Sequence, residues 1–345
     1  MECNILFAGV GSNGAVINQF QRAMETLGIR GKLIAADHTQ HVTGLMQADE
    51  SRITPKEAEC LYVDSLLHIC ESDNIRLLIP LRKSAMLPLS FARERFKSQG
   101  TLALVSDSET IQICLDQPLT HHFFTKNWVE IPIHYDLRDV LAGKVKPQFP
   151  LLLRSASESH PSSLEYRIEN TGDLEVYARK MRDPWLEEWI EGKEFLFDAY
   201  VGLDGVTRTV VPRLSVGDSQ GEKNTCIVLM EPSLSEGARK ITENLPDPLG
   251  PMTIRAKLDD SGLFKFMNIF PCFDRGTPLS ILSGADSPLW ILSELLGIEV
   301  NWSSVIVQDG GLMKSGDQEI TYNHPEIDRQ LPPVLKPEEK HTATA

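Results

Sequence analysis

The sequence predicts an α/β fold over its first third and an α+β fold over the rest. Between residues 1 and 107, short apolar runs alternate with helical segments, a pattern typical of a parallel sheet covered on both faces. From about residue 149 the apolar runs lie closer together, and turn signals such as Asp204-Gly205 separate them, which predicts antiparallel strands. A chain of 345 residues with 41% hydrophobic residues can bury a large core.

The first third begins with a buried strand, a glycine turn and a helix in which apolar residues recur at helical spacing. The expected elements of this part and of the segment after it are strands at residues 4–10, 32–36, 76–79 and 101–105, and helices at residues 15–27, 55–70, 87–99 and 109–127. The last helix leads into an extended segment that contains Pro132. This order predicts a Rossmann-like unit followed by a linker.

The remaining strands follow one another with little helix between them. They are expected within residues 150–156, 163–169, 185–190, 194–205 and 208–216, with a further hairpin over residues 252–270. We therefore divide the chain into a Rossmann-like unit (1–107), a linker helix and strand (108–144), a small central unit (145–210), a C-terminal unit (211–325) and a mobile tail (326–345). The tail is rich in Pro, Lys, Glu and Thr and offers almost nothing to bury.

Composition excludes several classes of function. The formal net charge of −14 and the pI near 5.1 argue against binding of nucleic acid through its phosphates. The six cysteines include no C-x-x-C pair, which favours reduced thiols over disulfides or a zinc site. The adjacent His121 and His122 point about 100° apart on a helix, so they do not predict a metal site. No signal peptide or membrane span is expected, so the protein is predicted to be cytoplasmic.

The glycine turn offers one functional hypothesis. Gly9, Gly11 and Gly14 match G-x-G-x-x-G between a strand and a helix, and Asp37 ends the next strand. That context is typical of dinucleotide-binding oxidoreductases. The alternative is that a first turn in any open parallel sheet favours glycine for tight packing, without a ligand.

The order of segments resembles the ATP-grasp superfamily, and within it the carbamoyl phosphate synthetase large-subunit-like branch of carboxylate and amine ligases. The resemblance covers residues 1 to about 297 and rests on MECNILFAGVGSNGAVINQFQRA, GKLIAAD, FPLLLRSASESHPSS, LEEWIEGKEFLFDAYV and PLGPMTIRAKLDDSGLFKFMNIFPCF. It implies an ATP-grasp fold with an N-terminal Rossmann-like domain that does not itself carry the nucleotide. The glycine turn is then explained without NAD.

The resemblance also implies six nucleotide contacts. Arg154 and Arg213 would face the phosphates, and Glu188 and Ile190 would offer a backbone carbonyl and N–H to the adenine edge. Two carboxylates match ribose-side positions of the family, and these are Glu187 and Glu194. Against this, a glutamate on an exposed strand or hinge needs no ligand.

Other positions depart from the family pattern. The magnesium ligands would be Arg255, Asn268 and Phe270, which together supply one neutral oxygen and no carboxylate. The flap, residues 155–163, has no glycine, and Gln117 replaces a basic residue in the linker. Binding of ATP or another adenine nucleotide is therefore expected to be weakened, and magnesium binding to be lost.

Three further positions lack residues that the family commonly uses. Cys272 stands where an arginine is common, and the strand ending in Ile79-Pro80 leads to Lys83 and Ala85 in place of an acid pair. We therefore expect an ATP-grasp protein with a degenerate active site and a binding or regulatory role. The alternatives are an active ATP-dependent ligase with Arg154 and Arg213 on the phosphates, and an NAD oxidoreductase. Similar proteins are commonly homodimers.

Overall fold

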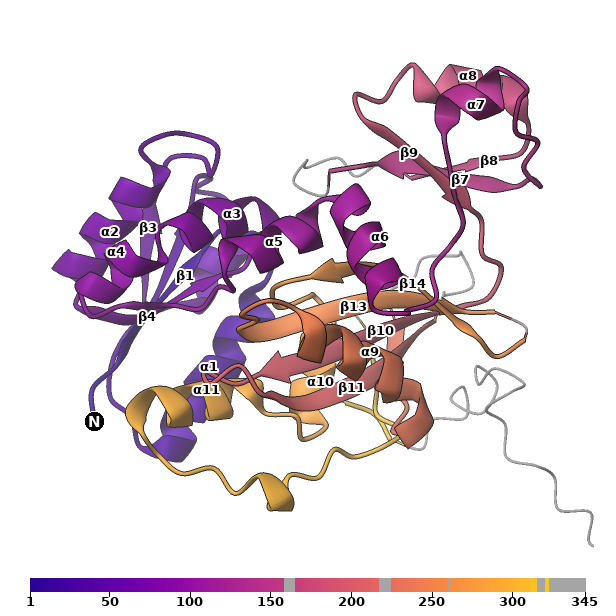
Figure 1. Ribbon diagram of the computed structural model, residues 1–345. Helices are drawn as coiled ribbons and strands as arrows, with labels where there is room; N and C mark the ends of the chain where they lie inside the picture. The colour runs from indigo at the N-terminus through magenta and orange to yellow at the C-terminus, as the bar shows by residue number, and fades with distance from the viewer. Residues whose placement is uncertain (158–164, 217–224, 260, 315–319, 323–345) are drawn as a thin grey trace, which may run out of the picture.

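The computed structural model contains three separate sheets (Figure 1). It describes residues 1–157, 165–216, 225–259, 261–314 and 320–322. A five-stranded sheet lies in the N-terminal part, a six-stranded sheet in the C-terminal part, and a four-stranded sheet stands apart from both, at the upper right of Figure 1. The predicted flap and tail lie outside the described residues, apart from Ser155–Ser157 of the flap.

The N-terminal sheet is parallel throughout, with strand order β3-β2-β1-β4-β5. Its strands are β1 (Asn4–Ala8), β2 (Leu33–Asp37), β3 (Glu50–Ile53), β4 (Ile75–Pro80) and β5 (Leu102–Ala103). The predicted α/β class is confirmed here. The strand β3 was not expected, because its alternately half-buried and exposed ESRI is too polar to resemble a strand buried on both faces.

The helices of this part and the linker are α1 (Gly14–Leu27), the 3₁₀ turn η1 (Thr43–Gln47), α2 (Tyr62–Ser72), α3 (Lys83–Phe91), α4 (Arg93–Ser98), α5 (Ser108–Leu115) and α6 (Gln117–Lys126). The single linker helix expected from the sequence is two helices. Asp116 caps the second one by accepting a hydrogen bond from the N–H of Leu119, and Pro118 occupies its first turn. The two helices therefore meet at Asp116.

The four-stranded sheet has the order β6-β9-β7-β8 and is antiparallel. It comprises β6 (His134–Tyr135), β7 (Leu151–Ser155), β8 (Tyr166–Ile168) and β9 (Pro184–Glu188), with α7 (Leu137–Leu141) and α8 (Thr171–Ala178) packed on it. In Figure 1 these two helices cover one face of the sheet.

The six-stranded sheet has the order β14-β13-β10-β11-β12-β15. Its elements and their neighbours are β10 (Lys193–Val201), β11 (Thr207–Val216), β12 (Thr225–Val228), α9 (Pro232–Asn244), β13 (Gly250–Leu258), β14 (Phe264–Phe270), α10 (Thr277–Leu282), α11 (Ser287–Leu296), η2 (Trp302–Ser304) and β15 (Leu312–Lys314). Both predicted hairpins form. The boundary expected at residue 210 falls inside β11, and β10 already belongs to this sheet, so the chain changes sheets between β9 and β10.

One apolar core joins the N-terminal sheet to the C-terminal part. Helix α1 packs against α10 and α11, and the rings of Phe20 and Phe273 meet edge to face at 5.9 Å between centroids. Figure 1 shows α1 beside α11, below the N-terminal sheet and to the left of the six-stranded sheet. This packing fixes the carboxyl ends of β1 and β4 beside the end of β14, where a cavity opens.

Candidate functional site

Two of the predicted nucleotide contacts are joined in a buried ion pair. Arg154 on β7 lies with its NH2 atom 3.0 Å from the carboxylate of Glu187 on β9, and both side chains are almost fully buried. The same NH2 group donates to the carbonyl of Met267 on β14, 3.2 Å away. Trp185 Nε1 donates to Glu187 at 2.9 Å. Arg154 therefore links the small sheet to the six-stranded sheet.

The second ribose-side position is also paired internally. Glu194 on β10 accepts a hydrogen bond from Nε of Arg255 on the neighbouring strand β13. The NH1 group of Arg255 donates to Glu165 at 2.8 Å, so one guanidinium contacts two carboxylates. The charge that a ribose or a metal would meet at this position is thus already opposed by a fixed cation.

In the hinge between β9 and β10, the contacts of the two predicted residues Glu188 and Ile190 differ. Glu188 accepts a hydrogen bond from the N–H of Ile133 at 3.1 Å and donates its own N–H to the carbonyl of Ile133 at 2.8 Å. The carbonyl of Ile190 accepts from Lys257 Nζ at 2.8 Å. The N–H of the buried Ile190 has no hydrogen-bond partner in the part of the chain that the structure describes. This is the group expected at the adenine edge.

Arg213 lies inside the protein. Its Nε and NH2 donate to both oxygens of Asp198 at 2.7 and 2.8 Å, and its NH2 also lies 3.1 Å from Asp274. The side chain has 0% exposure, and Asp198 further accepts from the hydroxyls of Thr253 and Ser280. A phosphate would have to displace this ion pair to reach the guanidinium. The surroundings of Arg213 are those of a structural residue.

The expected magnesium positions lie together but do not fit the ion. Arg255 on β13 is directly opposite Asn268 on β14, and Phe270 is opposite Thr253. Lys83 from α3 places its ammonium 3.5 Å from the centre of the Phe270 ring. Of the three expected ligands only Asn268 carries an oxygen, a neutral amide, whereas the guanidinium, the neighbouring ammonium and the phenyl ring offer none. Among the residues described, no group of three or more His, Cys, Asp or Glu could hold a metal ion.

The glycine turn makes contacts within the protein, and it also borders a cavity that Gly9 and Gly11 line. Asp37 accepts from the N–H of Gly11 at 2.9 Å and from Thr39 at 3.0 Å, and it pairs with Arg82 at 2.9 Å. The N–H of Gly44, on the turn η1, donates to the carbonyl of Gly11 at 2.9 Å. An NAD ribose would need Asp37, and a pyrophosphate would need open space over the turn. Asp37 is committed to contacts within the protein, whereas the turn itself faces a cavity, so these contacts do not decide between the two hypotheses.

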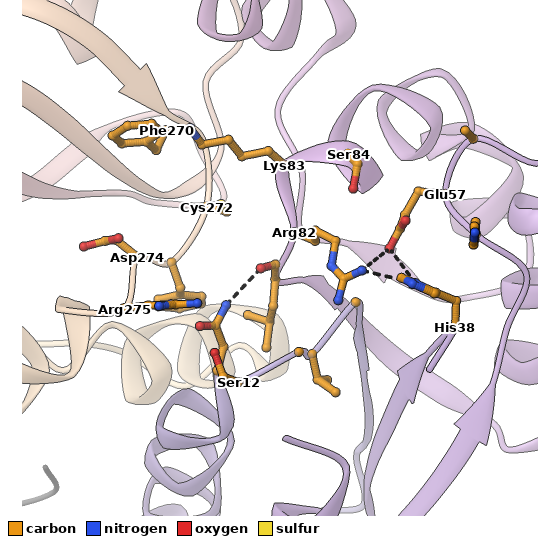
Figure 2. Close-up of a pocket in the computed structure, with 18 of the residues that line it drawn as sticks. Ser12, His38, Glu57, Arg82, Lys83, Ser84, Phe270, Cys272, Asp274 and Arg275 are labelled. Carbon is orange, nitrogen blue, oxygen red and sulfur yellow. Dashed lines mark hydrogen bonds and ion pairs between the residues drawn. The ribbon is translucent and has the colours of Figure 1, made fainter. Parts of the chain in front are cut away.

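A cavity of about 1050 Å³ lies at the carboxyl ends of β1 and β4 and beside the end of β14. Figure 2 shows Arg82 between this end of the sheet and the pair Glu57 and His38, with Phe270 and Arg275 across the cavity. The NH1 atom of Arg82 lies 3.3 Å from Glu57 and 3.1 Å from His38 Nδ1. None of the six predicted nucleotide contacts lines this cavity.

Sequence reasoning missed the basic residues of the cavity, Arg82, Lys56 and Arg275. A usable signal was present, because ligands of open parallel sheets bind outside the carboxyl ends of the strands. Arg82 directly follows the strand that ends at Pro80 and Leu81. The position of Arg275 across the cavity from Arg82 depends on the packing of α1 against α10, which a single sequence does not give.

An aromatic cluster lies beside Glu187. The ring of His134 stacks on Trp185 with centroids 3.7 Å apart, and His121 meets both rings edge to face. Burial lowers the pKa of His134, and burial together with His134 and His122 lowers the pKa of His121. His121 therefore takes part in packing, and His122 does not join the cluster.

Residues 5–104 match the family described as PylC-like, N-terminal domain. A comparison with curated proteins found no match. No helix in the described ranges is both long and apolar enough to cross a membrane.

Solved structures with similar folds cover 90% of this chain. They include the biotin carboxylase domain of Hydrogenobacter thermophilus 2-oxoglutarate carboxylase with MgADP, ADP and bicarbonate (15% identity, 73% of that chain, TM-score 0.68). Also similar are Bacillus licheniformis L-amino acid ligase (14%, 78%, 0.68) and Staphylococcus aureus N5-carboxyaminoimidazole synthetase with ADP (12%, 81%, 0.69). At these identities the likeness shows the fold. The chain therefore has the ATP-grasp fold with an N-terminal Rossmann-like domain, and its residues 5–104 match the PylC-like N-terminal domain family.

Proposed function

We propose that this chain is an ATP-grasp protein with a degenerate nucleotide and magnesium site and a binding or regulatory role. The observation that carries the proposal is Arg255, which occupies the expected position of a magnesium ligand and pairs with Glu194 and Glu165. A fixed guanidinium at that position repels a divalent cation and removes the carboxylate charge that would attract it. The protein's own side chain thus replaces the metal.

An adenine nucleotide can still bind weakly at the hinge. The unused N–H of Ile190 and the carbonyl of Glu188 would contact the base, Glu187 and Glu194 would lie on the ribose side, and Arg154 would lie near the phosphates. Glu187 and Glu194 already hold arginine partners, so a nucleotide gains only the difference between old and new contacts. Phosphate binding is expected to contribute less than it would beside bound magnesium.

The test is calorimetric titration with ATP, with and without magnesium. We expect the affinity of the unmodified protein to be the same in both conditions. The triple variant Arg255→Gln, Asn268→Glu and Phe270→Asn supplies oxygens in place of the cation and the ring, so its affinity should rise only when magnesium is present. The control is Arg179→Gln, which removes an exposed arginine directly after α8 and should change neither titration.

The alternative is an active ATP-dependent ligase that forms an acyl phosphate and transfers it to an amine. The free hinge N–H of Ile190 favours this alternative, as does the fold shared with L-amino acid ligase. An ATPase assay over candidate acids separates the two. The enzyme alternative would be supported by two results. ATP turnover would depend on magnesium, and magnesium would tighten ATP binding by the unmodified protein and by the triple variant alike.

Two further points extend the proposal. The biotin carboxylase domain named above is described as a dimer, and we propose that this chain is also a homodimer. Light scattering of the purified protein would give its mass directly, against 38.6 kDa for one chain. We further propose a cytoplasmic location, which fits cysteines that are all free in the structure.

A further inference from the structure

The six predicted nucleotide contacts do not line the cavity beside β14, whereas Lys83, Phe270 and Cys272, which the resemblance assigned to the active site, do line it. Four basic side chains line it, and these are Lys56, Arg82, Lys83 and Arg275. Among the described residues, two acidic residues line it as well, Glu57 and Asp274. The net charge of the chain is −14, so the excess of cations around this cavity is a local departure from the overall charge.

Both acidic residues are committed to arginines. Glu57 lies 3.3 Å from Arg82, and Asp274 lies 3.1 Å from the buried Arg213. Burial alone would raise the pKa of Asp274, but Arg213 and the N–H of Gly276 hold it below the usual value, so this carboxylate stays ionised and paired. Each acid therefore already has a cationic partner.

Two of the cations have no such partner. Lys56 and Arg275 are exposed, and neither forms an ion pair with any residue in the described ranges. They come from different parts of the fold, Lys56 from the segment after β3 and Arg275 from the segment before α10. A molecule that fills the cavity would therefore meet positive charge from both the N-terminal and the C-terminal part.

The other walls suit an organic ligand. Phe270, whose ring lies against the Lys83 ammonium, and Phe273 supply aromatic surface, and Ser12 and Ser84 supply hydroxyl groups. Figure 2 shows Ser12 near Arg275 and Ser84 near Lys83. Ligand cavities of this size combine apolar walls with a few polar groups in this way.

We propose that this cavity binds a small polyanionic metabolite, one that carries several carboxylates or phosphates, through Lys56 and Arg275 and without a metal ion. Arg82 is held in place by Asp37, Glu57 and His38, and its charge is already balanced by the two carboxylates, so the proposal does not depend on it. The inference goes beyond the nucleotide site, because it requires neither the hinge at Ile190 nor the pair of Glu194 and Arg255.

The experiment is titration calorimetry at low ionic strength with citrate and, separately, with pyrophosphate. Glucose is the uncharged probe. We expect at least one polyanion to bind with chelator present, and glucose not to bind. The tighter of the two anions identifies carboxylate or phosphate as the preferred group. Binding should weaken as salt is added, because the contacts are charged and partly exposed.

Charge-reversal variants test whether the anion binds in this cavity. Arg275→Glu and Lys56→Glu should each weaken binding of the anion by roughly tenfold or more, since each removes one charge-assisted contact and adds a repulsion. Arg22→Glu is the matched control, because Arg22 is exposed on α1 and does not line the cavity. It makes the same change in net charge and should leave the affinity within about twofold.

The outcomes decide clearly. If neither anion binds, or if the control weakens binding as much as the cavity variants do, the proposal is overturned. The double variant Glu194→Gln and Arg255→Gln separates this proposal from the nucleotide site, because it should alter ATP binding and leave anion binding unchanged. Equal loss of both would assign the anion to the nucleotide cleft and overturn the cavity.

Discussion

Replacing Arg255 by glutamine should destabilise the fold measurably. Two unit charges about 4 Å apart attract by about 4 kcal/mol at an effective dielectric constant of 20, before the cost of desolvation. The Arg255 side chain is 18% exposed and that of Glu194 is 9% exposed, so most of the attraction survives solvent screening. The contact with Glu165 counts for less, because 34% of that side chain is exposed. We expect the free energy of unfolding to fall by about 2–3 kcal/mol.

Urea denaturation of a double-mutant cycle measures this effect. The cycle compares Arg255→Gln, Glu194→Gln and the double variant, and their coupling energy should be about 1.5–3 kcal/mol. The control is Arg179→Gln, which breaks an exposed pair with Glu175 at 3.9 Å and should cost less than about 0.5 kcal/mol. A loss for Arg255→Gln no larger than the control's, or a coupling near zero, would refute the role of this ion pair.

Three other outcomes are expected. Arg213→Lys keeps the charge but loses the two parallel bonds to Asp198, so urea denaturation should show a loss of more than about 2 kcal/mol; an unchanged midpoint would contradict this. The lowered pKa values of His121 and His134 mean that the unfolded chain binds more protons below about pH 6.5. Stability should fall as the pH drops through that value, and replacing both by glutamine should flatten the slope between about pH 6.5 and 5; an unaltered slope would assign the effect elsewhere. Gly44→Ala would place its Cβ 2.9 Å from the carbonyl oxygen of Gly11, so the free energy of unfolding should fall by about 1–3 kcal/mol and the melting temperature should fall with it. NADH should not raise the melting temperature of either protein. A rise with NADH would support the dinucleotide hypothesis.

The backbone architecture was largely predictable because it follows local patterns. Buried strands separated by helices gave the parallel sheet, and the hairpin over residues 252–270 was visible in its alternation and its turn. The break at Asp116 was missed although Asp116 and Pro118 form an N-terminal helix signal, since apolar residues continue on both sides of it. The capping signal was present in the sequence, but the continuous spacing of apolar residues predicted one helix.

The pairing of residues across β13 and β14 was predictable, whereas the ion pairs between distant segments were not. The resemblance placed Arg255 and Asn268 on paired strands, and the structure pairs them directly. Nothing in the sequence indicated that Glu165, 90 residues away, would contact Arg255. Such a contact depends on how the small sheet lies against the six-stranded sheet. Tertiary placement of this kind has no signature in a single sequence.

Charge balance explains why the predicted contacts and the cavity differ in what they offer a ligand. A site built to bind ATP leaves its charges to be neutralised by the nucleotide and its metal, whereas here Arg154 faces Glu187 and Arg255 faces Glu194 before any ligand arrives. A nucleotide would exchange one set of buried ion pairs for another, which limits the net gain in free energy. In the cavity, Arg275 and Lys56 lie against solvent without an acidic partner in the described ranges, so an anion there adds contacts and breaks none. We therefore expect an anion to gain more binding free energy from Arg275 and Lys56 than a nucleotide gains from the paired arginines Arg154 and Arg255.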